Sequence, residues 1–316
     1  MLAACCGVGF IYHENTLIDF GIPTLICISL GLLFHFLGGS KNQGMGRRDA
    51  FLIVSTTWLL FSIIGMLPFL LSGIVTRPSV AFFETMSGFT TTGATALNGI
   101  DALPHSILFW RSLTHWVGGM GIIFFTLALL PALGVGEQQL FSAESTGLKL
   151  GKLHPRVSTT THWLWSTYLL VTVACALTYY LCGMNLFDAV NYSFATLATG
   201  GFGTHGDSIA YFHSPLIEYA SVVFMMLSSI NFTLLYLLVF KRRWRQTLRD
   251  EELRLYLFLV FLAVGIITLS KWLEAGDLSE HGFRESLFNV VAMMSTTGFT
   301  TENFLAWPHL TWIILL

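Results

Sequence analysis

One short motif occurs three times along this chain, with about a hundred residues between copies. The copies are SGFTTTGAT at residues 87–95, ATLATGGFG at 195–203 and MSTTGFTT at 294–301. Each copy follows a short amphipathic run and precedes a long apolar run. Because a repeat of this period reflects whole supersecondary units, the chain is expected to contain three copies of one structural unit.

The copies align on three glycines, Gly93, Gly200 and Gly298, each of which follows a threonine. Gly201 competes with Gly200 for the second position, and the Thr-Gly alignment favours Gly200. A polar residue stands nine positions before each of these glycines, namely Glu84, Asn191 and Asn289.

The amphipathic run in each copy is typical of a helix that enters a membrane and stops. Residues 78–92, 186–199 and 283–297 are too short to cross a bilayer, which takes about 20 apolar residues. Irregular backbone at membrane depth survives only where it is buried in protein or lines water. Glycine permits the turn, and several such loops around one axis can replace the water shell of a small cation. The negative ends of the half-helix dipoles would point at the same place, so the motif predicts an ion-selectivity filter.

The residues predicted to contact the ion lie at and just before the three glycines. They are Thr91, Thr92, Gly93, Ala198, Thr199, Gly200, Thr296, Thr297 and Gly298. Glu84, Asn191 and Asn289 are expected to fix each half-helix to its neighbours by hydrogen bonds, and direct contact with the ion is the alternative. A single Thr-Gly pair is most often an ordinary turn, but three copies in register favour a functional loop.

Composition places the chain among polytopic membrane proteins. Apolar residues make up 54% and charged residues 11%, whereas soluble domains carry about 25% charged residues. The net charge of −2 gives no reason to expect a nucleic-acid partner. The five cysteines lack metal-ligand spacing and no bound cofactor is expected. No clustered Ser/His, Asp/Asp or metal-ligand set is found in the sequence, which argues against an enzyme.

The fold class expected is all-α, with repeated span–half-helix–span units. The predicted organisation is residues 1–48 as extra N-terminal transmembrane segments, 49–133 as pore unit 1, 134–161 as a cytoplasmic loop, 162–240 as pore unit 2, 241–252 as a basic cytoplasmic loop and 253–316 as a shortened pore unit 3. Most of the 16 Lys and Arg residues lie in the loops at 38–48, 134–161 and 241–254, so the filter mouths are expected to face outside.

Three further features carry expectations. Arg111 is expected to pair with an acidic loop residue such as Asp101, or to extend to the membrane surface. Asn231 lies inside one continuous span predicted over residues 215–240, where an interhelical hydrogen bond is favoured over a role in lining the pore. The glycines of residues 118–121 indicate close helix packing, because no strand precedes them as a nucleotide-binding loop requires.

The chain resembles the TrkH-type potassium uptake proteins of bacteria, within the Trk/Ktr/HKT superfamily. The resemblance rests on FWRSLTHWVGGMG at 109–121, on ATGGF at 198–202 and on STTGF at 295–299. It implies four units around a pseudo-fourfold pore, each with one filter glycine, in a homodimer. It also implies a cytosolic TrkA-type nucleotide-binding regulator, K⁺ as the transported ligand, and a lipid environment in the bacterial inner membrane.

Compared with that family pattern, the third unit is shortened and a fourth is absent. The chain is therefore expected to be part of a longer transporter, whose native N-terminus is expected to lie before residue 1. The function expected is K⁺ uptake through a channel-like pore. The alternative is a Na⁺- or H⁺-coupled secondary transporter of lower K⁺ selectivity, because broken helices are typical of that class too. In the resembled family a filter Ser is associated with Na⁺ permeation, so the three glycines favour K⁺.

Overall fold

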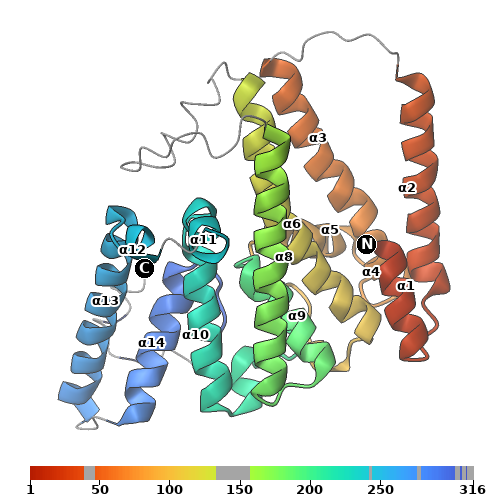
Figure 1. The fold of residues 1–316 in the computed structure, drawn as a ribbon. Helices are drawn as coiled ribbons and strands as arrows, with labels where there is room; N and C mark the ends of the chain where they lie inside the picture. Colours follow the sequence, from red (N-terminus) through yellow and green to blue (C-terminus); the bar gives the residue numbers. More distant parts are fainter. Residues whose placement is uncertain are drawn as a thin grey trace. The chain divides into compact units, whose positions relative to one another are not determined.

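The computed structural model describes residues 1–38, 47–132, 157–241, 244–275 and 279–302, together with Trp307 and Thr311. All regular structure in these residues is helical (Figure 1). The chain divides into two compact units, Met1–Val135 and Gly136–Leu316. The predicted cytoplasmic loop at 134–161 lies largely outside the described residues, as do the second span of the third repeat and most of the loop at 38–48.

The first unit begins with two helices that pack on each other, α1 (Leu2–Ile11) and α2 (Leu17–Leu37). Glu14, in the turn between them, accepts hydrogen bonds from the backbone N–H groups of His105 at 2.6 Å and Ser106 at 3.0 Å. These N–H groups open helix α6 (His105–Ala132) and have no partner within that helix. Burial raises the pKa of Glu14, but hydrogen bonds from Ser106 and His105 outweigh burial and hold that pKa below its usual value.

The span predicted over residues 51–71 is interrupted. It forms α3 (Arg47–Gly65) and α4 (Leu67–Leu71), and Pro68 stands in the first turn of α4, where its missing N–H costs nothing. The half-helix α5 (Pro78–Phe89) follows and begins with a proline. Gly118 of α6 lies against the end of α5, since a Cβ there would sit 2.0 Å from the carbonyl oxygen of Phe89. At this glycine the predicted close packing is confirmed.

The second unit holds the other two repeats. Its helices are α8 (Val157–Leu181), α9 (Leu186–Leu197), the 3-10 helix η2 (Ser208–Phe212), α10 (Pro215–Ser229), α11 (Phe232–Val239), α12 (Trp244–Thr247), α13 (Glu251–Ala275) and α14 (Glu280–Met294). The half-helix α9 packs on α8 and α10, and the half-helix α14 packs on α10 and α13 (Figure 1). Helix α10 therefore contacts both half-helices of this unit.

The expectation of one continuous span over 215–240 is wrong. The helix stops after Ser229, Ile230 is extended with ψ 141°, and α11 starts at Phe232. The hydroxyls of Ser228 and Ser229 both donate to the carbonyl of Met225, at 2.9 and 2.7 Å, and such bonds compete with the helix backbone. Asn231 lies at the break, where its carbonyl accepts the first hydrogen bonds of α11.

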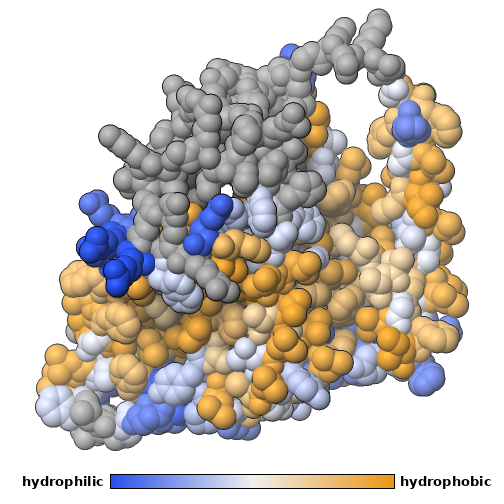
Figure 2. Space-filling view, viewed as in Figure 1, coloured by the Kyte–Doolittle hydropathy of each residue, from blue (hydrophilic) through white to orange (hydrophobic). Residues whose placement is uncertain are grey.

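Four helical segments among the described residues are long and apolar enough to cross a bilayer. They are Leu17–Leu37, Phe51–Leu71, Trp163–Leu181 and Glu251–Leu273. Large apolar side chains are exposed along α2 and α13, and the space-filling view shows apolar residues over much of the visible face (Figure 2). Surfaces of this composition are stable against lipid. The chain is a membrane protein built from apolar helices and half-helices.

Candidate ion-coordinating loops

The three half-helices end in the same backbone geometry. Just after each helix and its cap residue comes a threonine in the left-handed region, with φ 53° at Thr91, 50° at Thr199 and 58° at Thr296. A β-branched residue at positive φ is a genuine outlier, costing about 1–3 kcal/mol, and such strain concentrates at functional sites. The loops therefore share a strained conformation although their sequences differ.

A glycine with positive φ lies two positions further on in every loop. These glycines are Gly93 at 75°, Gly201 at 78° and Gly298 at 73°. The structural register of the second repeat is thus shifted by one residue from the register predicted from its sequence, and Gly201 takes the place expected for Gly200. The Thr-Gly pair misled the alignment because the other loops read Thr-Thr-Gly where this one reads Thr-Gly-Gly.

The same shift moves the predicted second triplet. Ala198 is the cap residue of α9, in the place that Thr90 and Ser295 occupy in the other repeats. The structurally equivalent triplets are residues 91–93, 199–201 and 296–298. Within the part of the chain that the structure describes, none of the nine backbone carbonyls in these triplets accepts a hydrogen bond. Carbonyls without protein partners are available to water or to a cation.

On the half-helices, the new register aligns Glu84 and Asn289 with Tyr192 instead of Asn191. All three aligned side chains bind the segment that follows the loop. Glu84 Oε2 accepts the N–H of Ala96 at 2.9 Å, the Tyr192 hydroxyl donates to the carbonyl of Ser208 at 3.0 Å, and Asn289 Nδ2 donates to Thr301 Oγ1 at 3.4 Å. Aligning the three repeats on the ends of their half-helices, instead of on the Thr-Gly pair, would have identified Tyr192.

Asn191 differs from its expected role. Its Nδ2 donates to the carbonyl of Phe187 in its own helix, at 2.7 Å, and its buried Oδ1 has no hydrogen-bond partner among the described residues. The additional anchor of the second repeat is Asp188, whose Oδ1 accepts the hydroxyl of Thr204 at 2.6 Å. Asp188 Oδ2 lies 3.2 Å from Nε2 of His205.

Glu84 lies at the centre of a buried charged cluster. Its Oε1 accepts Nε of Arg111 at 2.9 Å and the hydroxyl of Thr95 at 2.9 Å. The side chains of Glu84 and Arg111 are 0% and 1% exposed. The expectation that Arg111 extends to the membrane surface is therefore wrong, because its guanidinium is buried against the carboxylate of the first half-helix.

The second and third loops lie side by side in the second unit. A Cβ added at Gly201 would sit 2.1 Å from the carbonyl oxygen of Thr297, so only glycine fits there without displacing the neighbouring loop. Beyond the loops, Ala210 N–H donates to the carbonyl of Thr300 at 3.3 Å, and the rings of Tyr192 and Phe299 lie 5.6 Å apart. The second and third loops, and the segments that follow them, are thus in direct contact.

Half-helices that end in glycine loops with free carbonyls, between apolar helices, define a membrane protein of the ion-channel and transporter class. Residues 19–316 match the TrkH family of cation transport proteins, and the chain belongs to this family. Its members move ions across a membrane and are not enzymes.

The chain is similar to several curated relatives. It is 40% identical over 315 residues to the Trk system potassium uptake protein TrkH of Escherichia coli K12, covering 98% of this chain and 65% of that protein. It is 41% identical over 304 residues to the protein of the same name from Halomonas elongata, covering 95% and 63%.

Among solved structures, the crystal structure of the potassium transporter TrkH from Vibrio parahaemolyticus matches with a TM-score of 0.86 and 34% identity. The match covers 99% of this chain and 65% of that one. The chain therefore spans just under two thirds of the length of the relatives that it matches.

Proposed function

We propose that the three loops form part of the selectivity filter of a potassium-conducting pore, in a protein that takes up K⁺. The observation that carries this proposal is the shared loop geometry, a left-handed threonine and a positive-φ glycine with three free carbonyls after each half-helix. The names of the relatives, which describe potassium uptake proteins, support the choice of ion.

In this mechanism the carbonyls of residues 91–93, 199–201 and 296–298 replace the water shell of the ion. The negative ends of the half-helix dipoles add to the attraction. No chemical step is needed, because an inside-negative potential contributes about 2.3 kcal/mol per charge per 100 mV to cation entry. Glu84, Tyr192 and Asn289 would act as positioning residues that hold the outer end of each loop.

The proposal extends to the assembly that the resemblance implies. The loops would surround a pseudo-fourfold axis in a complete protein of four units, with their mouths facing outside in a bacterial inner membrane. The protein would be a homodimer, and a cytosolic TrkA-type nucleotide-binding protein would regulate it. Basic residues in the loop at 241–252 offer that partner a docking surface, and plain topology signalling is the alternative role for their charge.

A second candidate function is a Na⁺- or H⁺-coupled secondary transporter with lower K⁺ selectivity. The break between α10 and α11 favours it, because discontinuous helices line the ion sites of many such proteins. K⁺ uptake measured against K⁺ concentration separates the two functions. A channel-like pore shows little saturation, whereas a transporter that alternates its access saturates.

The test of the filter is a pair of glycine substitutions in the full-length protein. Gly201→Ser would push a side chain against the carbonyl of Thr297, and the K⁺/Na⁺ uptake ratio should fall by about tenfold as inward dipoles are lost. Gly183→Ser is the matched control, because Gly183 also has positive φ, at 109°, but open space around it outside the loops. Uptake is measured in cells lacking their own potassium systems.

Equal selectivity in the two variants would contradict the proposal. A third variant, Gly200→Ser, tests the register itself, because Gly200 is not among the glycines with positive φ. It should change the ratio less than Gly201→Ser does. A larger effect at Gly200 would restore the register predicted from the sequence.

A further inference from the structure

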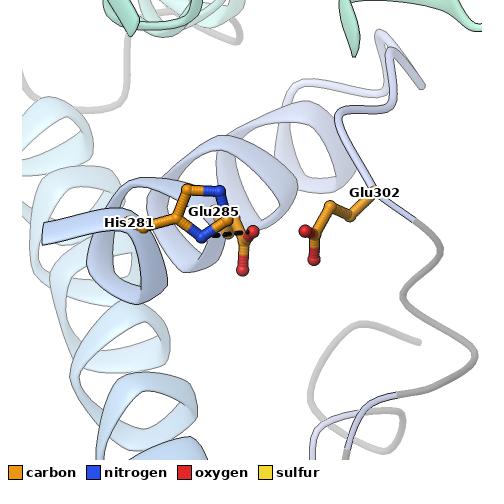
Figure 3. Close-up of side chains that lie close together, drawn as sticks. All are labelled: His281, Glu285 and Glu302. Atoms are coloured by element: carbon orange, nitrogen blue, oxygen red, sulfur yellow. Dashed lines mark ion pairs between the residues drawn. The ribbon is translucent and has the colours of Figure 1, made fainter. Parts of the chain in front are cut away.

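Three potential metal ligands meet at the start of the third half-helix. His281 and Glu285 lie one turn apart on α14, and Glu302 comes from the segment that follows the third loop (Figure 3). One ligand atom from each side chain lies within 4.8 Å of the other two. Figure 3 shows the Glu285 carboxylate between the His281 ring and the Glu302 carboxylate.

Glu285 supplies the buried member of this cluster. Its side chain is only 6% exposed, and its Oε2 accepts a hydrogen bond from Nζ of Lys271 at 2.6 Å. Its Oε1 forms an ion pair with Nδ1 of His281 at 2.8 Å, but without good hydrogen-bond geometry. A buried carboxylate oxygen without a well-aligned donor is costly unless a positive charge compensates it.

Lys271 orients the Glu285 carboxylate and is not itself a metal ligand. Metal-ligating carboxylates are commonly held by a hydrogen bond to one oxygen while the other oxygen binds the metal. Lys271 provides that hydrogen bond, and its ammonium is further placed over the ring of Trp307, at 4.3 Å from the centroid. With His281 neutral, the two carboxylates and the ammonium leave one net negative charge for a dication.

The donor set selects the kind of ion. Mg²⁺ and Ca²⁺ prefer oxygen ligands alone, whereas one imidazole nitrogen with two carboxylate oxygens suits Zn²⁺ and similar transition cations. Zn²⁺ bonds of about 2.0–2.2 Å place tetrahedral ligand atoms about 3.4 Å apart. The nitrogen of His281 and the oxygen of Glu285, now 2.8 Å apart, would therefore separate slightly, and Glu302 would adjust to complete the set. His281, 60% exposed, and Glu302, also exposed, have room for that movement.

We propose that His281, Glu285 and Glu302 form a binding site for a zinc-class divalent cation, with water in the fourth position. The cation would tie the start of α14 to the segment after the third loop, four residues beyond Gly298 in the sequence. It would thereby restrain the outer end of that loop. This site is separate from the predicted filter residues, so it stands whether or not those residues conduct K⁺.

The test is equilibrium binding of ⁶⁵Zn²⁺ to the purified full-length protein in detergent, with saturating K⁺ present. His281→Asn and Glu302→Gln should each weaken the high-affinity binding at least tenfold. His213→Asn is the matched control, an exposed histidine of the same unit outside the cluster, and it should bind Zn²⁺ like the unaltered protein. Excess Mg²⁺ should not displace the zinc.

Equal zinc binding by the cluster variants and the control would overturn the proposal and leave an ion-pair network of Glu285 with Lys271. Displacement by Mg²⁺ would also overturn it, because an imidazole ligand would then have no role. Both altered side chains are exposed, and thermal unfolding of each variant without zinc checks that the fold is kept. Glu302→Gln alone decides the matter if His281→Asn fails to fold.

Discussion

The first and second units hold their half-helices by different chemistry at the same position. In the first unit Glu84 is a buried carboxylate paired with Arg111, whereas in the second unit Tyr192 and Asn289 make neutral hydrogen bonds. The loops that follow nevertheless share their left-handed threonine and their positive-φ glycine. The comparison indicates that the backbone geometry of the loop is the common requirement, and that several side-chain anchors satisfy it.

The difference between charged and neutral anchors should be largest in the free energy of unfolding. Glu84→Gln removes the carboxylate that is buried against the Arg111 guanidinium, and removing one partner of such a pair costs about 3–5 kcal/mol. We expect a correspondingly large loss in the stability of the detergent-purified protein, measured by chemical unfolding. Glu84→Gln combined with Arg111→Met removes both charges and should recover most of it. A loss below about 1 kcal/mol in the single variant would show that the pair is solvated.

Tyr192→Phe removes the neutral anchor of the second repeat and should have an intermediate effect. The hydrogen bond to the carbonyl of Ser208 is lost, while the ring contacts with Phe212 and Phe299 remain. The expected destabilisation is about 1–3 kcal/mol, because the hydrogen-bond acceptor is left without its partner. The same unfolding assay measures it. A change as large as that of Glu84→Gln would remove the distinction between the two kinds of anchor.

The smallest effect is expected in the third repeat. Thr301→Val removes the hydroxyl that accepts Nδ2 of Asn289 at the long distance of 3.4 Å, while Nδ2 keeps its 3.0 Å bond to the carbonyl of Glu285. We expect a loss of under about 1 kcal/mol. Thr300→Val, next to it, is the comparison variant, since Thr300 is bound through its backbone. If Thr301→Val costs more than Tyr192→Phe, the third anchor has been underestimated.

Much of the fold follows from local patterns in the sequence. Apolar runs of membrane length predicted the spans at 18–37, 163–181 and 253–273, and each half-helix appears within a few residues of its expected limits. These features depend on composition and on short-range order. A single sequence carries both, so they could be read without any knowledge of tertiary contacts.

The remaining features depend on contacts between distant residues. Arg111 meets Glu84 across 27 positions of sequence, and nothing nearby in the chain distinguishes that partner from an acidic loop residue. The register of the second loop depends on where α9 ends, and both Gly200 and Gly201 fit the local pattern. The anchoring role of Tyr192 followed from that register, so it was missed together with it.

The central claim is that K⁺ binds to the backbone carbonyls of residues 91–93, 199–201 and 296–298. These are the triplets that become equivalent when the three loops are aligned on the ends of their half-helices. Diffraction from crystals of the full-length protein with Tl⁺ in place of K⁺ tests it directly, because the anomalous signal locates the ion. We predict peaks within coordination distance of carbonyls from residues 199–201 and 296–298, between two loops that already touch at Gly201 and Thr297. Ions found only away from these loops, or bound by residues 198–200 with the carbonyl of Gly201 turned away, would contradict the account.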